Sequence, residues 1–238
     1  SRLGPGITWH DLNDDGREDL LISGGRGDRS GAFQNEGQGR FSPINSPPFH
    51  LKNRLEQTSL LIVRAPDDSK MLLSGFSNYV TAAGPLMGSY NLDHQKFLGE
   101  LPQSDSATGP MALSDIDGDG DLDILSASFL DNKIAWYENT NGQGSFGPQI
   151  LISTEIIYPR NLFVQDLDND GDQDILSSSR NGSYSSIVWF ENLDGTGNFS
   201  SPILISDEID FATTIIATDI DQDQDFDVLS ASQFDQKI

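Results

Sequence analysis

The sequence contains no cysteine and only three histidines among its 238 residues. The absence of cysteine excludes disulfide bridges and thiol chemistry. Because there is also no Gly-x-Ser-x-Gly motif, the chain offers no nucleophile with a matching base, and an acyl-transfer site has no support. No apolar run approaches the ~20 residues that a membrane-spanning helix needs, so we expect no membrane insertion of this segment.

Basic residues are scarce as well, with 14 lysines and arginines against 37 aspartates and glutamates, for a net charge of −23. This charge makes nucleic acids and anionic membranes poor partners on electrostatic grounds. The acidity is strongly clustered, since 20 of the 37 acids fall in four stretches of nine residues. These stretches therefore need a physical explanation.

The clearest stretch is DIDGDGDLD at residues 115–123, where aspartates occupy alternate positions. Carboxylates this close repel one another unless a cation lies between them. Oxygens at positions 1, 3, 5 and 9, with a backbone carbonyl at position 7, suit the six to eight oxygen ligands of Ca²⁺. Gly120 at position 6 permits the sharp turn. Position 12 is Ser126, where an EF-hand needs glutamate, and residues 122–128 read as a strand, so we predict a calcium loop of another kind.

The stretch recurs at a regular spacing of 51 to 53 residues or twice that, beginning at Asp11, Asp115, Asp166 and Asp219. A fifth copy is expected near residue 62 and is present in altered form as LLIVRAPDDSKMLLSGF, residues 60–76. It keeps the apolar flanks but carries Ile62, Arg64, Pro66 and Lys70 where the other copies have ligands. We predict no metal there.

Each of the four intact loops is predicted to supply side-chain oxygens from positions 1, 3, 5 and 9 and a carbonyl oxygen from position 7. The ligand sets are Asp11, Asn13, Asp15, Arg17 and Asp19; Asp115, Asp117, Asp119, Asp121 and Asp123; Asp166, Asp168, Asp170, Asp172 and Asp174; and Asp219, Asp221, Asp223, Asp225 and Asp227. The last loop has Gln224 in place of the turn glycine, and a non-glycine residue at positive φ costs about 1 kcal/mol. The chain is thus expected to bind up to four Ca²⁺ ions.

The repeat extends beyond the loops, because KIAWYENTNGQGSFGPQILIS at residues 133–153 aligns with SIVWFENLDGTGNFSSPILIS at residues 186–206. Each unit reads as four short strands with the acidic loop between the first two and glycine-rich turns later. Four strands in about 50 residues indicate a propeller blade, so we predict an all-β fold, a β-propeller. We expect the recurring aromatic residues to pack between blades, with a sugar-binding platform as the alternative. They are Trp136, Tyr137, Trp189 and Phe190, and Trp9 in the first unit.

The predicted organisation is a single propeller domain over residues 1–238. Its repeats are residues 7–57, 58–107, 108–158, 159–210 and a truncated 211–238, which amounts to about four and a half blades.

These units resemble the FG-GAP repeats of the integrin α-subunit β-propeller and the related bacterial VCBS repeats. The resemblance is carried by the Asp-x-Asp-x-Asp-Gly-x-x-Asp loops and by the segments SFGPQ at residues 145–149 and NFSSP at residues 198–202. It implies a calcium site in each intact loop and a propeller of seven blades, of which this chain would be a part.

The function we expect is that of a calcium-binding propeller that acts as a binding or adhesion module for a protein or a glycan, without catalysis. Calcium would stabilise the folded chain, and cytosolic calcium is too low for most weak sites, so we expect an extracellular, cell-surface or periplasmic location. One alternative is a lectin-like, carbohydrate-binding propeller. Another is the frame of a secreted polysaccharide-degrading enzyme, which would need a carboxylate pair outside the calcium loops.

Overall fold

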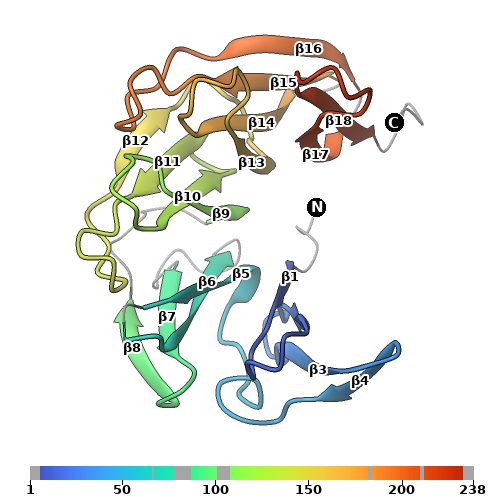
Figure 1. Ribbon diagram of the computed structural model, residues 1–238, viewed down its shortest axis with the longest axis vertical. Helices are drawn as coiled ribbons and strands as arrows, with labels where there is room; N and C mark the ends of the chain where they lie inside the picture. The colour runs from blue at the N-terminus through green and yellow to red at the C-terminus, as the bar shows by residue number, and fades with distance from the viewer. Residues whose placement is uncertain are drawn as a thin grey trace. The chain divides into compact units, whose positions relative to one another are not determined.

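A computed structural model describes residues 6–65, 67–77, 87–100, 108–181, 184–209 and 212–232. Its regular secondary structure within these ranges consists of β-strands, which form four four-stranded sheets and one two-stranded sheet. Figure 1 shows the sheets in chain order from blue to red. The fold is all-β and of the β-propeller class, as the sequence predicts. Over the same ranges, no helix is long and apolar enough to cross a membrane.

The strands of each sheet are hydrogen-bonded to one another in chain order, which is the up-and-down topology of a propeller blade. The first sheet contains β1 (Ile7–His10), β2 (Asp19–Ile22), β3 (Gly31–Gly37) and β4 (Arg40–Pro43). The second contains β5 (Glu56–Arg64), β6 (Lys70–Ser77), β7 (Met87–Asn91) and β8 (Lys96–Glu100). The third contains β9 (Met111–Ser114), β10 (Asp123–Ser128), β11 (Lys133–Tyr137) and β12 (Ile150–Ser153). The fourth contains β13 (Asn161–Gln165), β14 (Asp174–Asn181), β15 (Tyr184–Phe190) and β16 (Ile203–Ile209), and the fifth contains β17 (Ala212–Thr218) and β18 (Asp227–Ser232).

The chain divides into two compact units, one made of residues 1–111 and 140–146 and the other of residues 112–139 and 147–238. Side chains from both sheets of the first unit form its core, which includes Leu21, Phe49, Leu60 and Leu72. Burial of this apolar surface is the main force that holds neighbouring sheets together.

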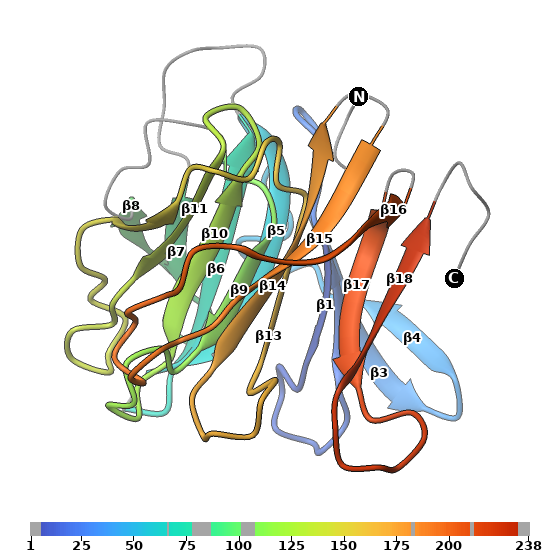
Figure 2. The ribbon, with the colours of Figure 1, turned by 90° about the horizontal axis from the view of Figure 1, so that it is seen from above.

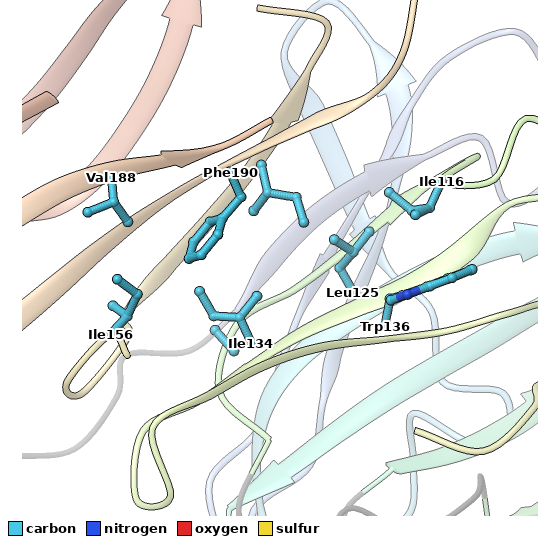
Figure 3. Packing of buried hydrophobic residues seen from close by; sticks show 9 residues of the cluster. Ile116, Leu125, Ile134, Trp136, Ile156, Val188 and Phe190 are labelled. Carbon is cyan, nitrogen blue, oxygen red and sulfur yellow. The ribbon is translucent and has the colours of Figure 1, made fainter. Parts of the chain in front are cut away.

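In the second unit, a larger core joins the sheet of β9–β12 to the sheet of β13–β16 (Figure 3). Ile134 and Phe190 are completely buried in it, and Trp136 is 4% exposed. Tyr137 is also completely buried. Trp189 packs against a separate cluster that includes Ile215 and Ala217 of β17. The positions of Trp136, Trp189 and Phe190 confirm the expectation that these aromatic residues pack between sheets.

Trp9 corrects that expectation for the first unit. It is 49% exposed and lies against Phe41 with a ring-centroid distance of 6.0 Å. The reason is its position on β1, an edge strand of its sheet. Residues on β1 alternate between exposed and half-buried. The sequence pattern around Trp9 does not distinguish an edge strand from a central strand.

Candidate functional site

Each acidic loop connects the first strand of a sheet to the second strand. The loops join β1 to β2, β9 to β10, β13 to β14 and β17 to β18, and position 9 of each is the first residue of the second strand. In the second unit, the loops after β13 and after β17 lie at the same end of their strands (Figure 2). The sheets therefore place the carboxylates at strand ends, where loops are free to adopt ligand-binding conformations.

The four loops share one hydrogen-bond framework, although their sequences differ. The carboxylate at position 1 accepts the backbone N–H of position 6 in every loop, at 2.7, 3.0, 3.0 and 3.1 Å in chain order. The carboxylate at position 5 accepts the N–H of position 7, at 2.9, 2.8, 2.9 and 3.0 Å. These bonds bend the chain around the carboxylates and hold their oxygens in place.

The same loops require left-handed backbone at two positions. Position 6 has φ between 80° and 102°, and it is occupied by Gly16, Gly120, Gly171 and Gln224. Position 4 also has positive φ, between 60° and 73°, and it is occupied by Asp14, Gly118, Asn169 and Gln222. Gln224 adopts the strained conformation that the sequence predicts for it. The requirement at position 4 was not foreseen, although aspartate, asparagine and glycine tolerate it best.

In the three four-stranded sheets that carry an acidic loop, the aspartate at position 9 is the buried member of that loop. Asp19, Asp123 and Asp174 are at most 1% exposed. One carboxylate oxygen of each accepts the N–H of position 2 at 3.0 Å. The other oxygen accepts a backbone N–H from the end of the third strand, at 2.7 to 2.8 Å. A carboxylate that accepts two N–H groups is fixed in orientation and retains lone pairs for a cation.

Three of the loops bring ionisable oxygens from positions 1, 3 and 9 within 4.8 Å of one another. The groups are Asp115, Asp117 and Asp123; Asp166, Asp168 and Asp174; and Asp219, Asp221 and Asp227. In the first loop, position 3 is Asn13, which contributes an amide oxygen in place of a carboxylate. The aspartates at position 5 lie outside these groups. Whether all twenty predicted ligands reach one ion per loop stays a prediction.

The electrostatics of these groups favour a cation. Burial raises the pKa of Asp123 to about 6, and it does the same for Asp174. Burial, followed by the neighbouring charges of Asp119 and Asp115, also raises the pKa of Asp117. Each shift means that a negative charge here is costly unless a positive charge compensates it.

One buried oxygen points to a missing partner. Oδ1 of Asp115 is buried and has no hydrogen-bond partner. A buried polar atom without a partner carries a desolvation penalty that a bound cation would remove. The oxygen-only donor set suits Ca²⁺, a hard cation that coordinates carboxylate and carbonyl oxygens. The residues present therefore fit the ion that the sequence predicts.

An asparagine at the end of the third strand belongs to the site and was missed in the sequence. Asn35, Asn139 and Asn192 donate the backbone N–H to the aspartate at position 9. Their side-chain amides also donate to the carbonyl of position 8, at 3.1, 3.2 and 3.4 Å. The signal was visible, because FQN, YEN and FEN recur at the same place in three units.

Asn192 makes a further contact that connects two loops of the second unit. Its side-chain nitrogen also donates to the carbonyl of Ile116, at 3.0 Å, and its oxygen accepts the N–H of Gly197 at 3.2 Å. Asn192 is completely buried. The acidic loops after β9 and after β13 are therefore held together by one side chain.

The fourth acidic loop is less enclosed than the others. Asp227 is exposed, and it accepts the N–H of Ile220 at 3.0 Å. The physical reason is that no third strand follows β18 in the described part of the chain, so no asparagine covers this carboxylate.

The altered loop of the second sheet, between β5 and β6, is flanked by two cationic residues. Arg64 pairs with Lys70 across β5 and β6, at the register where His10 pairs with Asp19 in the first unit. Arg64 therefore occupies the place of His10. The sequence alignment, which puts Arg64 at position 3 of the acidic loop, is wrong on this point. Five residues, and not eight, connect the two strands here. Lys70 occupies the position of the buried aspartate, and its ammonium group binds Asp14 at 2.6 Å.

Comparison with protein families identifies the acidic repeats. A family model described as an FG-GAP-like repeat matches residues 115–177 and again residues 166–230, which together span just under half of the chain. No curated protein shows significant sequence similarity to this chain.

Two solved structures illustrate the similarity of the fold. One is a lectin from Agrocybe aegerita that recognises non-reducing terminal N-acetylglucosamine, with 17% identity and a TM-score of 0.57 over 87% of this chain and 54% of the lectin. The other is an exo-β-1,3-galactanase from Phanerochaete chrysosporium in complex with β-1,3-galactotriose, with 9% identity and a TM-score of 0.56 over 86% of this chain and 51% of the enzyme. The chain thus spans about half the length of these proteins. At such identities the similarity concerns the fold alone.

Proposed function

We propose that this chain, which belongs to the FG-GAP repeat family of β-propellers, is a calcium-binding propeller that serves as a non-catalytic binding module outside the cytosol. The observation that carries the proposal is the hydrogen-bond framework shared by four loops of different sequence. The positive φ of Gln222 and Gln224 supports a common ligand, because strained backbone conformations are concentrated at ligand-binding sites.

In the acidic loops of the third and fourth sheets the residues have separate tasks. The carboxylates at positions 1 and 3 offer oxygens at the exposed side, and the carboxylate at position 9 offers one from the buried side. The asparagine of the third strand orients the carboxylate at position 9 through its backbone N–H. Calcium, when bound, supplies the positive charge that offsets the repulsion among these groups. Bound calcium would make each loop rigid, and other surfaces of the scaffold would meet a partner.

The first test is thermal unfolding of the chelator-treated protein in Ca²⁺, in Mg²⁺ and in neither. A ligand that binds only the folded state stabilises it by about 2.7 kcal/mol per site at one hundred times its Kd. We expect a large rise in Tm with Ca²⁺ and a much smaller one with Mg²⁺, which demands stricter geometry. Asp115→Asn combined with Asp117→Asn should reduce the rise, whereas Asp207→Asn, an exposed acid outside the loops, should not. A cooperative melt whose Tm does not change with Ca²⁺ would refute the proposal.

A second candidate function is binding of carbohydrate. Its support is that the two solved structures described above are a lectin and a glycan-degrading enzyme, both defined by their sugar ligands. A glycan array probed in parallel with a panel of extracellular matrix proteins separates this function from protein adhesion. The protein should be tested for release of reducing sugar from polysaccharides. Release that persists after every substitution in the calcium loops would favour the enzyme and contradict the non-catalytic role.

A further inference from the structure

A pocket of about 670 Å³ lies within the first compact unit, away from the acidic loops. Its floor is one face of the sheet that contains β6 and β7. Leu72 and Ser74 are two residues apart on β6 and stand opposite Tyr90 and Gly88 of β7, so these residues share a face. We call this cavity the Tyr90 pocket. Its volume is in the range of sites for small organic ligands.

Two aromatic rings lie beside Gly88 on this floor. Phe97 of β8 pairs with Tyr90, and it is 58% exposed at the pocket. A Cβ atom added at Gly88 would lie 3.4 Å from the ring of Phe97 and 3.6 Å from the ring of Phe76. The glycine therefore leaves a gap no larger than a methyl group between the two rings. The exposed ring of Phe97 beside this gap suits the C–H face of a sugar ring.

Part of the lining of the Tyr90 pocket is polar and held by hydrogen bonds among its own residues. The side-chain oxygen of Gln57 accepts from the hydroxyl of Ser30 at 2.5 Å and from the amide of Asn53 at 3.0 Å. The amide of Gln57 donates to the hydroxyl of Ser74 at 3.4 Å. Ser74 therefore keeps its own hydrogen for another acceptor. A preorganised network of this kind lowers the ordering cost of binding a hydroxylated ligand.

The charge of the pocket is opposite to that of the chain. Lys52 and Arg54 line it, and none of its lining residues is acidic, although acids outnumber bases in the sequence by 37 to 14. Neither cation forms an ion pair within the part of the chain that the structure describes. Arginine beside an apolar site is well suited to hold a carboxylate through two parallel hydrogen bonds.

We propose that the Tyr90 pocket binds a saccharide that carries a carboxylate, such as a uronic acid residue. The sugar ring lies against Phe97 and over Gly88, its hydroxyl groups meet Ser74 and the hydroxyl of Tyr90, and its carboxylate faces Arg54 and Lys52. This inference rests on the proposed role as a binding module and names the ligand class, but it is independent of the calcium loops.

The test is a calorimetric titration of the calcium-loaded protein with trigalacturonic acid and with the same trisaccharide after reduction of its carboxyl groups. Excess calcium is removed beforehand, because uronates bind free calcium. We expect the acidic trisaccharide to bind and the reduced form to bind roughly tenfold more weakly, as loss of a charge-assisted hydrogen bond implies. Equal affinity for both forms, or no binding of either, would overturn the proposal.

Two pairs of variants assign the binding to the pocket. Arg54→Met should weaken binding of the acidic form about tenfold and leave the reduced form unchanged, whereas Arg40→Met, an exposed arginine outside the pocket, should change neither. Phe97→Ala should weaken both forms, and Phe41→Ala serves as its control. Binding that Arg54→Met and Phe97→Ala leave intact would refute the pocket.

Calcium-dependent melting of every variant separates the two proposals. A preparation that responds to calcium but binds no uronate would overturn the pocket alone. A preparation that binds the acidic trisaccharide through Arg54 without any response to calcium would support the pocket and overturn the calcium-binding function.

Discussion

The ammonium nitrogen of Lys70 lies 2.6 Å from Oδ2 of Asp14, and the lysine side chain is only 5% exposed. Asp14 stands at position 4 of the first acidic loop, and Arg64 binds its other oxygen. Hydrogen bonds from Lys70 and Arg64 lower the pKa of Asp14. The second sheet, which has no acidic loop of its own, thus supplies fixed cations to the acidic loop of the first sheet.

This contact predicts that Lys70 weakens calcium binding in the first loop. For a unit charge and a divalent ion on the order of 10 Å apart in water, the repulsion corresponds to about a threefold to fivefold change in affinity. Lys70→Met should therefore increase the calcium affinity of the first loop by about that factor. The backbone amide signal of Gly16 in an NMR titration reports this loop, and those of Gly120 and Gly171 serve as internal references.

Lys96→Met, at an exposed lysine on β8, is the matched control for Lys70→Met. The effect should shrink in high salt because the ion lies in an exposed loop, but by less than for an exposed lysine, since salt screens a buried charge less. An unchanged or lower affinity in Lys70→Met would contradict the electrostatic explanation.

The second prediction concerns pH. Burial raises the pKa of Asp123 to about 6, above the value of 3.8 for an unperturbed aspartate. The folded, calcium-free state therefore holds this proton more tightly than the unfolded state. The stabilisation is fully present below pH 3.8 and is lost as pH rises through about 6, so the calcium-free protein should lose on the order of 1 kcal/mol from this carboxylate between pH 5 and 7.

Urea unfolding in chelator at pH 5 and pH 7 measures this loss, and comparison with Asp123→Asn isolates it from the other acids. With saturating calcium the direction should reverse, because the ion binds the ionised form and protons compete with it. A wild-type protein and an Asp123→Asn variant with the same pH dependence in chelator would show that Asp123 does not titrate as predicted.

The third prediction concerns Asn192. Its side chain is completely buried and bonds to Ile116, Gln173 and Gly197. Asn192→Ala leaves buried backbone groups without partners, so the free energy of unfolding should fall by about 2–4 kcal/mol. It should also weaken calcium binding in the two loops that it connects.

Asn198→Ala is the control for Asn192→Ala, because Asn198 is exposed in the same turn and its side-chain amide donates to the exposed Asp194 at 3.2 Å. Its free energy of unfolding should change by less than about 0.5 kcal/mol. Similar losses in the two variants would contradict the role assigned to Asn192.

The fourth prediction concerns backbone strain in the last acidic loop. Gln224 has φ of +80°, and glycine occupies the equivalent position in the other loops. Gln224→Gly should stabilise the calcium-loaded protein by about 1 kcal/mol, since glycine adopts this conformation without steric cost. Gly120→Ala, at φ +92° in the third sheet's loop, should have the opposite effect. Chemical unfolding in saturating calcium measures both, and destabilisation by Gln224→Gly would contradict the assignment of strain.

The elements that depend on local pattern can be predicted from the sequence alone. The alternating aspartates, the glycine at position 6 and the ~50-residue period sufficed to predict the repeats, the strand content and the loops, because turn conformation and strand alternation are short-range properties. The buried aromatic positions followed from their recurrence in matched segments.

Tertiary structure decided what depends on contacts between distant residues. Trp9 is exposed because β1 is an edge strand of its sheet. Asp227 is exposed because, among the described residues, no third strand covers it. The pairing of Lys70 with Asp14 joins residues 56 positions apart, and the bond from Asn192 to Ile116 spans 76. The Tyr90 pocket likewise combines Ser30 with Phe97. Such contacts arise when sheets stack and hydrophobic burial selects the faces that meet, and no local pattern encodes that choice.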